Sequence, residues 1–447
     1  MDGVQGRPLD GVVVASFEHA VAVPYAARLL ADLGARVIKV ERRGEGDFAR
    51  HYDRSCGGVS SYFAWTNGGK ESITLDLKHD DGVAVARRLV ERADVVLVNL
   101  SPGAARRLGL DADSLRAARP ELIVAELSSY GSGGPYAGRK AFDALVQSEA
   151  GLISITGDGE VTARAGISVA DIAGGVQLHA AVLAALLHRS RTGVGATLRL
   201  SLLEGLAEWM HQPLFYALGT GSAPPRTGAH HASIAPYGPF VCADGAAVHL
   251  AVQNEPQWRR LCVDVLGQPE LADDPRFADN PSRVANRTEL HAVLDAACKR
   301  TTAAELLAAL DAADVPGAQT RDLFEVASHP QLAARERWVQ LPVPAGNGDG
   351  RRDGDNRGGD NGRGGDDGQG GDDGQGGGSG EDSAGPMGAP ADRGRAAVPM
   401  LRPPVDSDGW QWSPAPVPAV GEHTDSVLAW LGYPVEEIDA LRNRGAV

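Results

Sequence analysis

The stretch GVVVASFEHAVAVPYAARLLADLGARVIKVE, residues 11–41, contains the first repeat of the pattern that decides the fold. Residues 11–15 form a short apolar run that is typical of a buried strand. Residues 24–33, which begin with a proline and end before a glycine, predict a helix. Residues 35–41 predict a second strand. A strand, a helix and a strand at this spacing make one βαβ unit.

The same alternation continues along the chain. Further strands are expected at residues 73–77, 94–99, 121–128 and 196–201, and helices at residues 80–92, 114–118, 171–191 and 202–218. Strands that alternate with helices predict an α/β fold with a parallel sheet and helices on both faces. In such sheets ligands bind at the carboxyl ends of the strands.

Small residues and prolines at 220–225 suggest a domain boundary. The following segment predicts a hairpin with Asp244-Gly245 as its turn, and then several helices. The sequence predicts a large domain at 1–225, a smaller α+β domain at 226–335, a linker at 336–398, and a C-terminal segment at 399–447 that returns to the large domain. Helices are expected in the second domain at residues 256–266, 287–299 and 302–312, and in the last segment at 425–431 and 434–444.

The linker contains a low-complexity Gly/Asp-rich insert at residues 347–388. Its composition buries too little apolar surface to offset the entropy of ordering, so a disordered loop is expected. A tolerated surface insertion and a segment that captures a partner are both open interpretations.

Charge and cysteine content limit the class of protein. The formal net charge of the 447 residues is −15, so a basic nucleic-acid-binding surface is not expected. The four cysteines form no metal-binding spacing, and we expect reduced thiols, no metal and a cytoplasmic location. The polar N-terminus lacks a signal-peptide core, and no uncharged apolar run is long enough to span a membrane, so no membrane partner is expected.

Asp171 lies in RAGISVADIAGG, residues 164–175, where an apolar run gives way to a long helix. A carboxylate at a helix N-terminus is stabilised as an anion, and the neighbouring glycines let another backbone or a ligand approach closely. Asp171 can therefore be the N-cap of the helix or a buried nucleophile. The local pattern alone leaves both interpretations open.

Common nucleotide and hydrolase motifs are absent from the sequence. The first strand leads into SFEHAVAVP, residues 16–24, which has no glycine, so the GxGxxG fingerprint of dinucleotide enzymes is missing. The chain also lacks a GxxxxGK[ST] phosphate loop and a GxSxG nucleophile elbow.

Eight segments in order resemble one family, the class III CoA-transferases of the CaiB/BaiF and formyl-CoA transferase type. The resemblance covers nearly the whole chain except the insert. The matching segments are LADLGARVIKVE (30–41), SITLDLK (72–78), DVVLVNLSPG (94–103), YGSGGPY (130–136), FDALVQSEAG (142–151), VADIAGG (169–175), RTGVG (191–195) and GEHT (421–424).

The resemblance implies a Rossmann-like large domain, a small domain and two chains interlocked as a homodimer. It also implies that Asp171 is the nucleophile. Asp171 would attack an acyl-CoA to give an aspartyl anhydride and CoA thiolate, and the thiolate would then form an aspartyl-CoA thioester. A free carboxylic acid would reverse these steps. Acyl-CoA would be a substrate, and no tightly bound cofactor is expected.

The resemblance also places a CoA pocket. His19, Val21 and Ala22 would line the pantetheine path. Basic or amide side chains would meet the phosphates and the rest of the pocket, namely Lys39, Arg42, Asn99, Arg107 and Lys140. Lys39, Arg42 and Arg107 could instead be solvated surface charges. Phosphate recognition favours arginine, which supports the pocket role of Arg107.

Two differences from related sequences restrict the expected type of reaction and substrate. Related racemases have a histidine where this chain has Phe142, and a phenyl ring cannot carry a proton, so racemase activity is disfavoured. The tetraglycine loop of some formate and oxalate enzymes is replaced here by residues 233–238. The preceding His230 and His231 resemble members that act on small dicarboxylates such as succinate, mesaconate, itaconate or citramalate. These histidines could bind a distal carboxylate or cap a loop.

The sequence thus predicts a CoA-transferase. An acyl-CoA racemase or isomerase on the same fold, and a non-catalytic CoA-binding protein, remain the alternatives.

Overall fold

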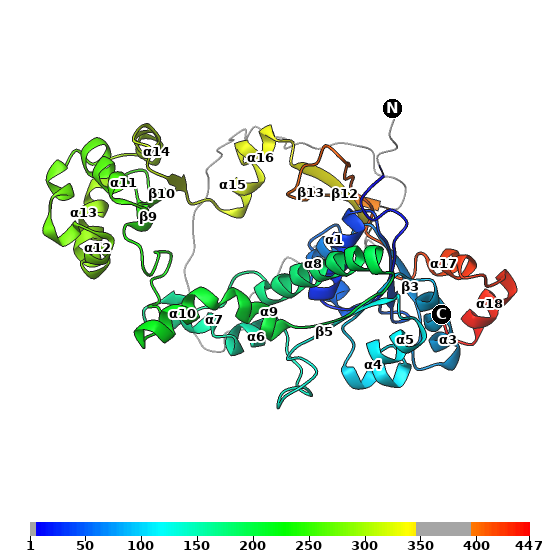
Figure 1. The fold of residues 1–447 in the computed structure, drawn as a ribbon. Coiled ribbons are helices and arrows are strands. Elements are labelled where there is room, and N and C mark those ends of the chain that lie inside the picture. Colours follow the sequence, from blue (N-terminus) through cyan, green and yellow to red (C-terminus); the bar gives the residue numbers. More distant parts are fainter. Residues whose placement is uncertain (1–5, 346–394) are drawn as a thin grey trace, which may run out of the picture.

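A six-stranded parallel sheet is the centre of the computed structural model, which describes residues 6–345 and 395–447 (Figure 1). The strand order is β3-β2-β1-β4-β5-β8, and every neighbouring pair is parallel. The strands are β1 (Val13–Phe17), β2 (Arg36–Glu41), β3 (Lys70–Thr74), β4 (Val95–Val98), β5 (Ile123–Ser128) and β8 (Thr197–Ser201). The predicted α/β class is confirmed. The order reverses between β1 and β4, and this switch point is where open α/β sheets leave a crevice for ligands.

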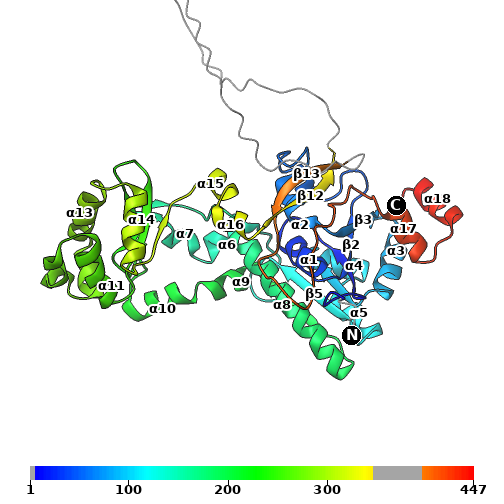
Figure 2. The ribbon, with the colours of Figure 1, turned by 90° about the horizontal axis from the view of Figure 1, so that it is seen from above.

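Helices cover both faces of this sheet (Figure 2). One face is covered by α1 (Ala22–Asp32), α6 (Asp143–Glu149), α8 (Val169–Thr192) and α9 (Leu202–Trp209). The other face is covered by α3 (Asp80–Glu91), α4 (Pro102–Leu108), α5 (Ala112–Ala118), α17 (Thr424–Trp430) and α18 (Val435–Asn443). Successive strand residues alternate between the two cores, as Val14 and Ala15 do. Both faces are therefore buried, which explains the continuous apolar runs in the sequence.

Helix α8 packs closely against α1 because glycines follow Asp171. A Cβ atom on Gly175 would lie 2.7 Å from the carbonyl oxygen of Ala22, and a Cβ atom on Gly174 would lie 2.8 Å from Leu202. The expectation that these glycines admit a neighbouring backbone is confirmed for Gly175. The contact brings the start of α8 next to the start of α1.

By length and composition α8 could cross a membrane, although the sequence reading expected no such segment. Core helices of soluble proteins meet the same criteria, and α8 packs against α1, α6 and α9.

A two-stranded antiparallel sheet lies in the region for which the sequence predicts a linker. Strand β12 (Trp338–Pro344) pairs antiparallel with β13 (Arg395–Leu401), and the pair shares a small core with α2 (Ser61–Asn67) and the 3-10 turn η1 (Phe48–His51). The sequence analysis did not predict these strands, because the insert separates each strand from its partner along the chain. The insert itself, 347–388, lies outside the described residues.

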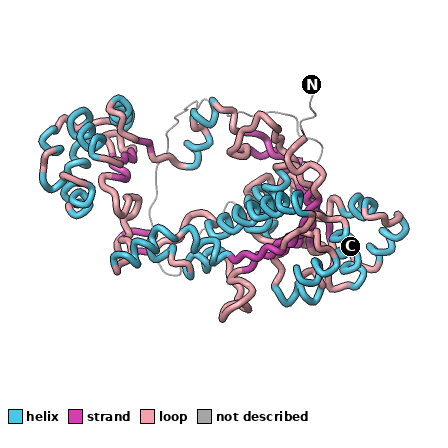
Figure 3. The backbone as a smooth tube through the Cα atoms, viewed as in Figure 1, coloured by secondary structure: helices cyan, strands magenta, loops and turns pink. Residues whose placement is uncertain are grey.

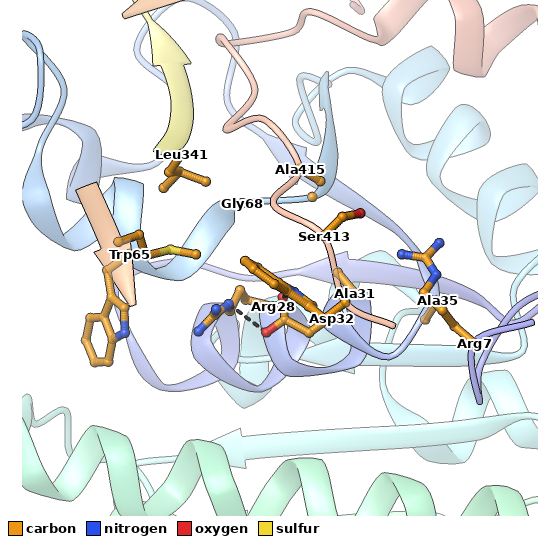
Figure 4. Close-up of a pocket in the computed structure, with 13 residues that line it drawn as sticks. Arg7, Arg28, Ala31, Asp32, Ala35, Trp65, Gly68, Leu341, Ser413 and Ala415 are labelled. Carbon is orange, nitrogen blue, oxygen red and sulfur yellow. Dashed lines mark hydrogen bonds and ion pairs between the residues drawn. The ribbon is translucent and has the colours of Figure 1, made fainter. Parts of the chain in front are cut away.

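The segment after β13 passes over α1, as Figure 4 shows. Ser413 and Ala415 line a small cavity of about 150 Å³ together with Arg28 and Asp32, which form an ion pair. The indole of Trp412 donates to the Asp32 carboxylate at 2.8 Å. These contacts attach the C-terminal segment to the large sheet.

A second group of elements surrounds a separate core, away from the large sheet (Figure 1). Its antiparallel sheet consists of β9 (Tyr237–Val241), β10 (Ala247–Ala251) and β11 (Gly317–Gln319). Its main helices are α11 (Glu255–Arg260), α12 (Asn280–Ala285), α13 (Arg287–Cys298) and α14 (Ala303–Ala312). The predicted hairpin is confirmed, with Gly245 at φ 82° in its turn. The domain boundaries remain a prediction.

Short helices connect the two regions, and the helical parts of these connections are cyan in Figure 3. They are α10 (His211–Thr220), α15 (Leu323–Ala327) and α16 (Pro330–Ala334), whereas α7 (Leu152–Ile155) follows α6. The single helix predicted at 202–218 is wrong, since Met210 separates α9 from α10. The helix predicted at 256–266 is likewise divided into α11 and the π-helical turn η2 (Leu261–Val265). The strands β6 (Gly157–Asp158) and β7 (Val161–Thr162) form a small separate hairpin.

Candidate active site

Asp171 lies in the first turn of α8, as its third residue. The N-cap residue is Ser168, so the N-cap interpretation of Asp171 is wrong. Among the described residues, no hydrogen bond or ion pair engages the Asp171 carboxylate. A half-buried carboxylate that forms no hydrogen bond or ion pair with the protein is free to react with a substrate.

Asp143 and Gln147 of α6 fix the start of α8. The Asp143 carboxylate accepts a hydrogen bond from the Ala170 amide at 2.8 Å and another from Gln147 at 2.7 Å. The Gln147 carbonyl oxygen accepts from the Ala165 amide at 2.9 Å. These two buried side chains therefore hold the backbone on the N-terminal side of Asp171 in place.

Burial raises the pKa of Asp171 to about 7, and the like charge of Asp143 adds to the effect. The sequence suggested that the helix terminus would keep Asp171 ionised. This expectation is wrong, because burial and Asp143 outweigh the modest stabilisation by the helix dipole. A carboxylate whose pKa lies near neutrality is typical of a functional site.

A cavity of about 720 Å³ opens at the carboxyl ends of β1 and β2, beside the switch point. His19 and Phe48 form part of its wall. The side chain of Asn99, which follows β4, accepts a hydrogen bond from the His19 amide at 3.1 Å and donates to the His19 carbonyl at 2.8 Å. Asn99 thus joins the two sides of the switch point and fixes the turn after β1.

Four cations line the same cavity, and three apolar side chains accompany them from the segments after β3 and β4. The cations are Arg42, Arg43, Lys78 and Arg107, and the apolar residues are Leu75, Leu77 and Leu100. All four cations are exposed. A concave site with a basic rim and apolar walls suits a ligand that carries both phosphates and apolar groups.

Six charged side chains form a buried network under this cavity, which we call the charge hexad. Its members are Glu18, Lys39, Glu41, Asp47, Arg50 and Lys70. The Lys39 ammonium lies 3.2 Å from Glu18 and 2.8 Å from Asp47, and the Lys70 ammonium lies 2.5 Å from Glu18. Burial lowers the pKa of Lys70 to about 8.

The hexad also supports the turn that carries His19. Asp47 accepts a hydrogen bond from the amide of Ala20 at 3.2 Å, and Ala20 has a left-handed φ of 67°. Asp47 also accepts from the Ala49 amide at 3.0 Å, at the start of η1. One buried carboxylate therefore sets the positions of both His19 and Phe48.

The predicted pocket residues fall into separate places. His19, Arg42 and Arg107 line the cavity, and Asn99 braces it. Lys39 is fully buried in the hexad and does not line the cavity, so it is no solvated surface charge. Val21 and Ala22 are buried at the start of α1, and Lys140 is exposed in the loop before α6. The CoA-binding roles of these residues stay a prediction.

Several residues of the site were not predicted from the sequence. Arg43 and Lys78 line the cavity, and Asp143 fixes α8. Arg43 follows a residue that the sequence did select, and Lys78 follows the end of a predicted strand. Both Arg43 and Lys78 follow the carboxyl end of a predicted strand, which is where parallel sheets bind ligands, so the sequence contained a signal for both.

The histidines at the start of the second region have structural contacts. His231 accepts a hydrogen bond from the Ser233 amide at 3.2 Å and stacks on Tyr237. The His230 ring packs 4.3 Å from that of His291. Within 6–345 and 395–447 no group of three or more His, Cys, Asp or Glu could hold a metal, and all four cysteines are free.

Comparison with known proteins identifies the family. A model of CoA-transferase family III matches residues 9–350. The acetyl-CoA:oxalate CoA-transferase of Acetobacter aceti is 38% identical over 335 residues, which cover 74% of this chain and 86% of that protein. The succinate–glutarate CoA-transferase of Agrobacterium fabrum is 37% identical over 348 residues, which cover 76% of this chain and 86% of that protein.

A solved structure agrees with these relatives. A CaiB/BaiF family protein from Brucella suis superposes with a TM-score of 0.75 and 30% sequence identity, over 95% of this chain and 100% of that chain. The chain therefore belongs to CoA-transferase family III, the CaiB/BaiF type, and is a CoA-transferase.

Proposed function

We propose that this enzyme moves CoA from an acyl-CoA donor to a free carboxylic acid through covalent intermediates on Asp171. The observation that carries the proposal is a half-buried, unpartnered carboxylate with a pKa near 7. Aromatic rings extend from the cavity wall to the segment that begins α6. The Phe48 ring, in the cavity wall, lies 6.4 Å from the ring of Phe142, which directly precedes Asp143.

The proposed reaction consists of two exchanges. An oxygen of Asp171 adds to the thioester carbonyl of the donor, and the carbon–sulfur bond breaks to give an aspartyl anhydride and CoA thiolate. The thiolate then attacks the Asp171 carbonyl carbon, releases the donor acid and leaves an aspartyl-CoA thioester. The acceptor acid repeats these steps in reverse. In this proposal acyl-CoA is a substrate and no tightly bound cofactor takes part.

In the proposed binding mode the CoA moiety occupies the 720 Å³ cavity. Its phosphates meet Arg42 and Arg107, and its pantetheine arm passes His19 toward Asp171. Small dicarboxylic acids are the proposed acyl groups, which the names of the two relatives support. The test is a screen by mass spectrometry, in which succinyl-, acetyl- and formyl-CoA are each offered acids of one to eight carbons. A chain that binds CoA and transfers it to none of them would contradict the proposal.

The proposal includes a cytoplasmic homodimer. Large apolar side chains on the connecting helices support the dimer, because α10 exposes Phe215 and Leu218 and α15 exposes Leu323 and Phe324.

Arg107→Ala is expected to raise the KM for acyl-CoA about tenfold or more and to leave kcat unchanged, because a charged hydrogen bond to a phosphate is lost from both the ground state and the transition state. Steady-state kinetics measure both constants. The matched control is Arg106→Ala, since Arg106 is equally exposed and lines a different cavity. Equal KM values for the two variants would contradict the phosphate role of Arg107.

The rate of Asp171 acylation is expected to rise with pH up to about 7 and to level off above it, because only the carboxylate attacks. The folded pKa lies above the unfolded value, so protonation of Asp171 stabilises the fold, and this contribution is lost as the pH rises through about 7. Single-turnover rates between pH 5 and 9 measure the midpoint. Asp143→Asn removes the like charge and keeps an oxygen for the Ala170 amide, so it should move the midpoint to lower pH. An unchanged midpoint would exclude Asp143 as a cause.

A further inference from the structure

A row of aromatic rings extends from α2 to the segment before α6. The rings of Tyr62 and Tyr52 are perpendicular with centroids 5.5 Å apart, and Tyr52 lies 5.9 Å from Phe48. Phe48 in turn contacts Phe142 edge-on at 6.4 Å. Edge-to-face packing of this kind fixes ring orientation. Tyr52 therefore has a defined position between Tyr62 of α2 and Phe48 in the cavity wall.

The backbone beside Tyr52 is also fixed. The carboxylate of Asp53 accepts hydrogen bonds from the Ser55 amide at 2.9 Å and the Ser61 amide at 2.9 Å. It also accepts from the Ser61 hydroxyl at 2.7 Å. This loop closes onto the start of α2. The backbone beside Tyr52 is thus fixed by hydrogen bonds, and its ring is fixed by the neighbouring aromatic rings.

The Tyr52 hydroxyl has no hydrogen-bond partner among the residues that the structure describes. The side chain is 47% exposed, so a substrate can reach it. Partial burial of the side chain raises the pKa of Tyr52 to about 12, and the charges of Asp47 and Asp171 act in the same direction. The phenol therefore stays protonated and keeps a free donor in the field of the Asp171 carboxylate.

The proposed reaction requires such a donor. When an Asp171 oxygen adds to the thioester carbonyl, the electron pair of the carbonyl π bond moves onto its oxygen. Fixed donors lower the energy of that oxyanion. The Ala170 amide at the same helix terminus already donates to Asp143. Among the described residues, burial and the charge of Asp143 set the pKa of Asp171, and both raise it.

We propose that Tyr52 is a further catalytic residue, whose hydroxyl donates a hydrogen bond to the acyl oxygen as Asp171 adds to the thioester. The proton stays on Tyr52, and the oxyanion collapses with release of CoA thiolate. The inference rests on the proposed function, since it assigns a role in acyl transfer through Asp171.

The test compares Tyr52→Phe with Tyr62→Phe, because each substitution removes one hydroxyl and keeps a ring in the row. Enzyme and acyl-CoA are mixed for a single turnover, and hydroxylamine traps the acylated Asp171 for mass spectrometry. We expect Tyr52→Phe to slow acylation about 10²-fold, the usual loss for one oxyanion donor, with the KM for acyl-CoA unchanged. Tyr62→Phe should acylate at the wild-type rate, and both variants should unfold at the wild-type temperature.

Wild-type acylation by Tyr52→Phe overturns the inference and leaves the proposed function intact. An equal loss in both variants also overturns it, since the effect then belongs to the aromatic row and not to the hydroxyl. A wild-type enzyme that forms no adduct at Asp171 overturns the proposed function together with the inference.

Discussion

Asp171→Asn is expected to abolish CoA transfer, with a fall in kcat of about 10⁴-fold or more, as is usual when a covalent nucleophile is removed. The amide cannot attack a thioester, while its size and its place in the first turn of α8 stay the same. A coupled assay of acyl-CoA formation measures the loss. Hydroxylamine added to the wild-type enzyme with acyl-CoA should convert Asp171 to a hydroxamate that the variant lacks.

Asp143→Asn is the matched control, since it removes the neighbouring carboxylate and retains an oxygen that accepts from the Ala170 amide of α8. It should keep transfer activity and form the Asp171 hydroxamate. Substantial activity in Asp171→Asn, with no hydroxamate at Asp171 in the wild type, would place the nucleophile elsewhere and refute the proposed mechanism.

Lys39→Met is expected to lower the free energy of unfolding by about 3–5 kcal/mol, the usual cost of breaking a buried ion pair by removing one partner. Asp47 and Glu18 are both buried, and Asp47 would lose the ammonium that lies 2.8 Å away. Glu18 would keep its ion pair with Lys70. Urea unfolding, followed by circular dichroism, measures the change.

The control for Lys39→Met is Arg259→Met, which removes an exposed ion pair with Asp273. Surface pairs contribute about 0–1 kcal/mol, so this variant should unfold close to the wild type. If the two variants lose equal stability, the hexad does not stabilise the fold. The KM of Lys39→Met for acyl-CoA reports separately on the phosphate role that the sequence suggested for Lys39.

The sequence predicts most strands of the large sheet well, because both faces are buried and the apolar runs are continuous. It places β3 three residues too late, at 73–77 in place of Lys70–Thr74. It does not predict the order of the strands. Parallel pairing joins segments far apart in the chain, such as β5 with β8, and no local pattern records the partner of a strand. The hairpin of β12 and β13 was missed for the same reason, since the insert separates its strands.

The candidate site is predicted in part. The position of Asp171 at a helix start follows from its neighbours, but its raised pKa depends on Asp143, which a fold must bring close. Lys39 offered a signal that could have revealed the hexad. A lysine in the middle of a strand buried on both faces requires nearby counter-charges, because lysine is almost never fully buried unless it is paired.

Three positive and three negative side chains make up the charge hexad, so this buried network beneath the cavity has no formal net charge. Attraction for a polyanionic ligand must then come from the exposed Arg42, Arg43, Lys78 and Arg107 at the rim. Mobile ions screen exposed charges over about 8–10 Å at ordinary ionic strengths and reach buried pairs much less. The ion pairs of the hexad are therefore insensitive to salt. Added salt should weaken binding of the ligand at the rim and leave the structure of the cavity unchanged.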